Sequence, residues 1–169
     1  GLAQVDRQKN LPLHSAIERG DAIPLHVLQK MVQKYPEAAT KKDREGNTPL
    51  HSACECRSQN LDKIVQLLLK ADPHNIAIQA KDKGGNLPLH CACENIKPCG
   101  NTILLLMRAY PEALQKRDKS RNLPIHSAIE NVGNVPVGVI EEMLNLFPDA
   151  VKKHDWDGQL PLHCVFHRP

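Results

Sequence analysis

The sequence predicts an all-α solenoid in which a helix–loop–helix unit repeats along the chain. A four-residue signature, Leu/Thr-Pro-Leu/Ile-His, recurs five times in the 169 residues. Its histidines, spaced 36 to 39 residues apart, are His14, His51, His90, His126 and His163. An aspartate precedes each of them by eight residues, and the first four are followed by a glutamate after four residues and a proline after 21 or 22. These coincident anchors at one period indicate a repeated structural unit.

The signature proline predicts where the first helix of each unit begins. Proline suits the first turn of a helix because its missing N–H would have no helical partner there. We expect a helix of about ten residues after each signature. One position in it is always small, which would let neighbouring first helices approach closely, and its members are Ala16, Ala53, Ala92 and Ala128.

An apolar stripe at helical spacing predicts the second helix of each unit, as in Ile64, Val65, Leu68 and Leu69. Pro24 and Pro136 begin two of these helices. A proline-containing turn and a polar loop then lead to the next anchor aspartate. Glycines such as Gly46 and Gly158 suit the tight turn at the loop tip. The two extra residues before His90 fall after Pro73, where a loop accepts insertion at little cost.

The segment DREGNTPLHSAC, residues 43–54, closely resembles the ankyrin repeat. The resemblance implies an ankyrin-type α-solenoid with β-turn fingers, and it covers nearly the whole chain. The units differ from the usual 33 residues, with the excess mostly between helices. Only Thr48 retains the usual threonine, so its hydroxyl contact to the histidine should be missing in the other units.

The repeat pattern predicts one domain, a single array over residues 1–169. It comprises four full repeats, which start near Leu11, Thr48, Leu87 and Leu123, and a half repeat from Leu160. No polar cap is evident at either end, although a repeat stack needs one for solubility. We therefore expect a monomer unless the uncapped ends associate.

Composition argues against several classes of partner. The net charge of +3 is too small to indicate a nucleic-acid-binding protein. Aromatic residues, on which such proteins stack bases, make up only 3% of the chain. No apolar run approaches the ~18 residues that cross a bilayer. The six cysteines, without an Asn-x-Ser/Thr sequon, favour a reduced, intracellular protein of the cytoplasm or nucleus.

No cofactor, metal site or catalytic residue is expected. The resemblance implies that the signature histidines are structural and hydrogen-bond within and between loops. Cysteines two residues apart on a helix point in nearly opposite directions, so Cys54 and Cys56 cannot chelate one metal ion together. Cys54 and Cys93 share the core register of Ile17 and Ile129 and should be buried. Partial exposure is expected for Cys56, Cys91, Cys99 and Cys164.

Two columns of equivalent residues carry the functional prediction. The position after the anchor aspartate reads Arg7, Arg44, Lys83, Lys119 and Trp156. The position four after the histidine reads Glu18, Glu55, Glu94, Glu130 and His167. The resemblance implies that these are loop-tip and concave positions, which usually contact partners. The glutamates could instead only solvate the face or pair with lysines, whereas an exposed tryptophan is typical of a binding hot spot.

The sequence thus predicts a non-catalytic module that binds another protein through its concave face and finger loops. The predicted partner-binding residues are Arg44, Glu45, Glu55, Lys83, Glu94, Lys119, Arg121, Glu130 and Trp156. Two alternatives remain: a regulatory or substrate-docking array of a larger, possibly enzymatic protein, and a scaffold without a partner. The outer second helices carry no comparable column, so changes at Gln33 or Lys70 should leave binding unaffected.

Overall fold

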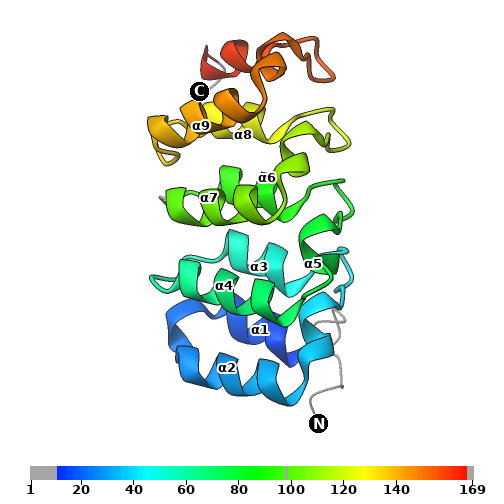
Figure 1. Ribbon diagram of the computed structural model, residues 1–169, viewed down its shortest axis with the longest axis vertical. Coiled ribbons are helices and arrows are strands. Elements are labelled where there is room, and N and C mark those ends of the chain that lie inside the picture. Colours follow the sequence, from blue (N-terminus) through cyan, green and yellow to red (C-terminus); the bar gives the residue numbers. More distant parts are fainter. Residues whose placement is uncertain (1–10, 98, 167–169) are drawn as a thin grey trace.

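The computed structural model describes residues 11–97 and 99–166, with side chains as far as Cys164. The secondary-structure elements of the described residues are all helices, joined by turns and loops, and these residues contain no strand. Helical layers stack along the long axis of the molecule, from the N-terminal pair to the last helical turn, and the loops between layers gather along one edge (Figure 1). Two members of the predicted columns, Arg7 and His167, lie outside the described residues.

The first helices begin where the signature prolines predict. They are α1 (Pro12–Glu18), α3 (Pro49–Glu55), α6 (Pro88–Glu94) and α8 (Pro124–Glu130). Each has seven residues, so the expected length of about ten is wrong. After α3 and α6 the next residue, Cys56 or Asn95, already has an extended backbone, which ends the helix.

The second helices form a parallel row beside the first. They are α2 (Leu25–Lys34), α4 (Leu61–Ala71), α7 (Gly100–Ala109) and α9 (Val137–Leu146). Proline-led 3-10 turns follow three of them, η2 (Pro36–Thr40), η3 (Pro111–Gln115) and η4 (Pro148–Lys152). A further short turn, η1 (Gly20–Ala22), lies between α1 and α2. The longer unit has a short helix instead, α5 (Ile76–Gln79), which Asn75 introduces with φ +56°.

The core lies between the two rows of helices. The four small first-helix alanines are all buried, which confirms that neighbouring first helices approach closely there. The stripe of α4 buries Ile64, Val65 and Leu68 in the same core. Ile129 is only partly buried but packs against the same core.

The last described segment is the 3-10 helix η5 (Pro161–Phe166), where the signature had predicted an α-helix. It packs against α8. Its residue Leu162 remains 68% exposed.

Candidate functional site

The signature histidines join each repeat to the next through backbone hydrogen bonds. The Nδ1 atom of His51 accepts from the Thr48 N–H at 3.1 Å, so the proton lies on Nε2, which donates to the Asn86 carbonyl at 3.1 Å. His14 and His90 make the same two bonds with Leu11 and Asn47, and with Leu87 and Asn122. His126 departs from the pattern, because its Nε2 donates to the Lys153 carbonyl instead. The expected structural role of the histidines is confirmed.

Burial keeps these imidazoles neutral. It lowers the pKa of His14, His51 and His126, and it lowers the pKa of His90 to about 4. The Thr48 hydroxyl lies 2.9 Å from His51 Nδ1, and leucine replaces it beside the other described signature histidines. The predicted loss of the threonine contact in those units is therefore confirmed.

Each finger in the described part of the chain is a tight loop closed by its anchor aspartate. Asp43 Oδ1 accepts from the Asn47 backbone N–H at 2.8 Å, and its Oδ2 accepts from the Asn47 side chain. The pairs Asp82–Asn86 and Asp118–Asn122 repeat this arrangement. An asparagine four residues before the histidine is therefore a second signature of the finger. This spacing can be recognised in the sequence alone.

Backbone hydrogen bonds hold the fingertips in line. The Lys83 N–H donates to the Glu45 carbonyl at 2.8 Å, Lys119 N–H to Gly84 at 2.8 Å, and Trp156 N–H to Ser120 at 2.9 Å. The described members of the column, Arg44, Lys83, Lys119 and Trp156, thus form one row of neighbouring positions. These four residues are exposed, and Trp156 is 72% exposed.

Two predicted site residues on this row pair with each other. Lys83 Nζ lies 3.6 Å from Glu45 Oε2, and both side chains are more than 60% exposed. Such an exposed ion pair contributes at most about 1 kcal/mol. It does reduce the free charge that this fingertip offers, whereas Arg44, Lys119 and Arg121 are exposed and take part in no ion pair within the described residues.

Other basic finger residues connect the repeats. Lys42 Nζ donates to the Lys81 carbonyl, Lys81 Nζ donates to the Arg117 carbonyl, and the Arg117 guanidinium donates to the His154 carbonyl. Each cation lies directly before an anchor aspartate, a regularity that the sequence contains. These bonds could not be predicted from the sequence, because they depend on how the loops lie relative to one another.

The first-helix glutamates form one acidic row. Glu94 accepts a hydrogen bond from the Ser127 hydroxyl at 3.0 Å, across to the next first helix. Burial in the wall, reinforced by Asp118, Glu130 and Glu55, raises the pKa of Glu94 even though its side chain still reaches solvent. Burial likewise raises the pKa of Glu55, opposed in part by a hydrogen bond with Cys91. None of the described lysines forms an ion pair with this row.

A hollow beside the last described finger brings two predicted site residues together. It measures about 470 Å³ and has Trp156 and Glu130 in its lining. The rest of its lining, to which the sequence assigned no role in binding, is Ser120, Asn122, Asp155, Asp157, Gln159 and Cys164. The hollow offers an aromatic face beside carboxylates and amides.

The cysteines offer no activated thiol. All six are unpaired and buried, which confirms the expectation for Cys54 and Cys93. The partial exposure expected for Cys56, Cys91, Cys99 and Cys164 is wrong, because all four side chains are buried. Burial raises the pKa of Cys99 to about 11, and its thiol donates to the Ala92 carbonyl. Within the described residues, no group of three or more His, Cys, Asp or Glu side chains could hold a metal ion.

The outer side of the stack has a surface feature of its own. A groove of about 610 Å³ lies between α2 and α4. Its lining includes Gln33 and Lys70, the two exposed positions at which changes are predicted to leave binding unaffected. The outer helices therefore form a groove that the hydrophobic periodicity of one helix could not predict. The groove depends on how the second helices of two repeats pack side by side.

Comparisons with known proteins agree with the repeat geometry. A family model described as ankyrin repeats, in three copies, matches residues 13–113, more than half of the chain. No curated protein matches the sequence significantly. No described helix is long and apolar enough to cross a membrane. Proteins bind one another through repeats of the matched kind, which are generally not catalytic. The chain therefore belongs to the ankyrin repeat family, whose repeats are protein–protein interaction modules.

Proposed function

We propose that the row of fingertips and the acidic row of first-helix glutamates form one concave surface that binds a partner protein without catalysis. The observation that carries the proposal is the alignment of Lys83, Lys119 and Trp156 by hydrogen bonds between fingers. A row fixed by backbone bonds is pre-organised, so a partner loses little free energy in ordering it.

Trp156 is the proposed anchor. Its ring is 72% exposed beside a hollow of about 470 Å³, and exposed tryptophans are enriched among binding hot spots. Arg44, Lys119 and Arg121 steer the partner, with a smaller contribution from Lys83 because Glu45 pairs with it. The acidic row of Glu55, Glu94 and Glu130 supplies the opposite sign beside the fingertips.

We further propose that residues 1–169 form one array of four full repeats and a half repeat, which acts as a monomer in a reducing, intracellular compartment. The six unpaired cysteines support an intracellular location, because a reducing compartment keeps cysteines as free thiols. The hydrogen bonds that pass from each finger to the next support a single array.

Binding measurements on variants test the proposed surface. A partner captured with the wild-type chain and identified by mass spectrometry is titrated against Trp156→Ala, Arg44→Glu and Glu141→Ala. Trp156→Ala should weaken binding by about 2 kcal/mol, roughly 30-fold, as expected for a hot spot. Arg44→Glu should mainly slow association and flatten its salt dependence.

Glu141→Ala is the matched control, because Glu141 is exposed on α9 and lines none of the described hollows. Its affinity should equal that of the wild-type chain. Wild-type affinity for both Trp156→Ala and Arg44→Glu would place the partner elsewhere and overturn the proposal.

A further inference from the structure

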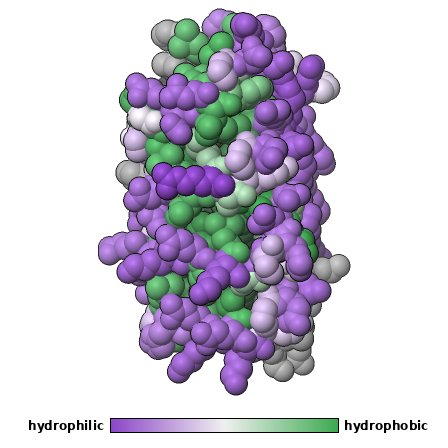
Figure 2. Space-filling view, in the orientation of Figure 1, coloured by the Kyte–Doolittle hydropathy of each residue, from purple (hydrophilic) through white to green (hydrophobic). Residues whose placement is uncertain are grey.

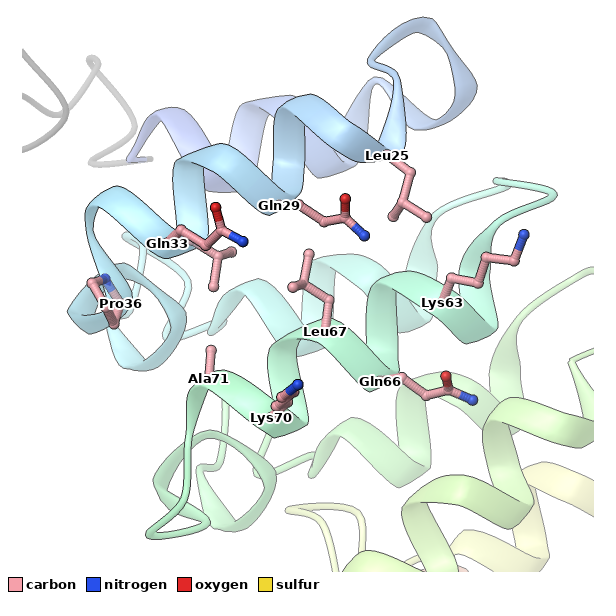
Figure 3. Close-up of a pocket in the computed structure, with 10 residues that line it drawn as sticks. Leu25, Gln29, Gln33, Pro36, Lys63, Gln66, Leu67, Lys70 and Ala71 are labelled. Atoms are coloured by element: carbon pink, nitrogen blue, oxygen red, sulfur yellow. The ribbon is translucent and has the colours of Figure 1, made fainter.

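The groove between α2 and α4 runs along one face of each helix (Figure 3). Its lining residues lie three or four positions apart on both helices, from residue 25 to 33 and from 63 to 71. At 1.5 Å per residue, each stretch is about 12 Å long, or two helical turns. The groove is therefore long enough to hold about two turns of a third helix.

The floor of the α2–α4 groove is apolar. Leu25 and Val32 contribute from α2, and Leu67 and Ala71 from α4. Leu25 and Leu67 reach toward the space between the two helices (Figure 3) and are only partly buried. Apolar surface also gathers in bands between hydrophilic side chains on the face that Figure 2 shows. An occupant with an apolar face would remove this floor from water.

The rim of the groove is cationic. Lys63 and Lys70 lie seven residues apart on α4, so their Cα atoms are separated by about 10.5 Å along the helix axis. Both are exposed, and neither takes part in an ion pair among the described residues. The lining contains no carboxylate, and its other polar side chains, Gln29, Gln33 and Gln66, can both donate and accept hydrogen bonds.

We propose that the α2–α4 groove binds an acidic amphipathic helix of another protein. The apolar face of that helix packs on Leu25, Val32 and Leu67, and two of its carboxylates, seven residues apart, meet Lys63 and Lys70. This is the helix-in-groove mode of recognition, selected here by charge complementarity. A second copy of this chain is a poorer match, because its own net charge is +3.

A second outer groove provides the comparison. It lies between α7 and α9, measures about 470 Å³, and also has an apolar floor that includes Leu104 and Leu146. Its lining carries one cation, Arg108, and one anion, Glu142. Because these two charges balance, the α7–α9 groove does not favour an acidic occupant. The α2–α4 groove therefore differs from it in charge as well as in shape.

Peptide selection tests the proposal on the intact chain. A display library of random 16-residue peptides is selected on the wild-type chain and, in parallel, on Lys63→Glu/Lys70→Glu. The wild-type chain should enrich peptides with apolar residues at helical spacing and Asp or Glu seven residues apart. A synthetic enriched peptide should bind Lys63→Glu/Lys70→Glu at least tenfold more weakly, measured by fluorescence anisotropy.

Three variants separate this groove from other surfaces. Lys30→Glu changes an exposed α2 lysine outside the lining, and Arg108→Glu changes the second groove, so both should bind within twofold of wild type. Trp156→Ala should also leave this peptide's affinity unchanged, although it weakens binding at the fingertips. The neutral variant Lys63→Gln/Lys70→Gln should show an intermediate loss, and its thermal unfolding checks that the fold is intact.

Several outcomes would overturn the proposal. These are the absence of any peptide enriched over Lys63→Glu/Lys70→Glu, enrichment of peptides without paired acidic residues, and loss of binding in Trp156→Ala instead of the lysine variant. A dimer of the wild-type chain that Lys63→Glu/Lys70→Glu dissolves, seen by sedimentation, would assign the groove to a second copy and equally overturn it.

Discussion

Arg121 lies at a backbone position that glycine occupies in the neighbouring fingers. Its φ is +63°, and the equivalent residues Gly46, Gly85 and Gly158 have φ between +75° and +84°. A residue with a Cβ is strained in this left-handed region by about 1 kcal/mol, whereas glycine is not. We predict that Arg121→Gly raises the free energy of unfolding by roughly 0.5–1 kcal/mol, measured by urea denaturation.

Gly158→Ala is the reverse change at the same register. No atom lies within 4 Å of the added Cβ, so backbone strain alone should lower stability, by about 1 kcal/mol. A loss of stability in Arg121→Gly would show that contacts of the arginine side chain outweigh the strain. A gain would indicate that the arginine is retained for its charge on the fingertip row.

Single residues were predictable where one repeat determines their surroundings. The exposure of Trp156 follows from its place on an Asp-Trp-Asp-Gly turn, and the burial of Cys54 and Cys93 follows from the helical register. The burial of Cys56 and Cys99 did not follow from helical register, because both residues lie just outside the helices. The sequence also could not show that Lys83 pairs with Glu45, since they belong to different fingers.

At the scale of the element, buried asparagines hold the ends of the first helices. The Asn95 side chain, next to α6, donates to the Cys54 carbonyl at 2.6 Å and to the Cys56 carbonyl at 3.1 Å, at the end of α3. Asn131 donates in the same way to the Cys93 and Asn95 carbonyls. Terminal helix carbonyls lack partners within their own helix, so these two asparagines supply donors to the ends of α3 and α6.

Removing one of these amides should therefore weaken the whole stack. We predict that Asn95→Ala lowers the free energy of unfolding by about 2–4 kcal/mol, because two buried carbonyls lose their donor. Asn101→Ala, an exposed position on α7, is the matched control and should change stability by less than about 0.5 kcal/mol. Equal effects of the two substitutions in urea denaturation would contradict this role for Asn95.

Helix starts were predictable because proline acts locally at the first turn. Helix ends were not, because bonds from the next repeat, such as those of Asn95, help to set them. The two extra residues after Pro73 were placed correctly on a loop, but the helix α5 within it depends on Asp72, whose carboxylate accepts from the Ala77 N–H at 2.6 Å. Element boundaries in this chain are thus partly tertiary.

At the scale of the whole molecule, the signature histidines make stability depend on pH. His14, His51, His90 and His126 each use a neutral ring to bond a neighbouring repeat, and burial lowers the pKa of all four. A lowered pKa of a base means that the unfolded chain binds the proton more readily. The stability that these histidines contribute is therefore complete above pH 6.5 and is lost as the pH falls toward their folded-state values.

We predict that the free energy of unfolding decreases steadily from pH 7 to pH 4.5, measured by urea denaturation at fixed ionic strength. For His90 the shift from 6.5 to about 4 corresponds to about 3 kcal/mol over its full range. Glu55 and Glu94 oppose this decrease, because a raised carboxyl pKa favours the folded state as the pH falls. Both side chains reach solvent, which limits their effect, so the histidines should dominate.

His90→Gln separates the histidine contribution from the rest. The amide can still accept and donate a hydrogen bond but does not titrate, so this variant should be less stable than wild type at pH 7. Its stability should also fall less steeply between pH 6.5 and pH 4.5. An equally steep fall in both proteins would mean that His90 does not resist protonation in the folded state, and that other groups cause the acid sensitivity of the stack.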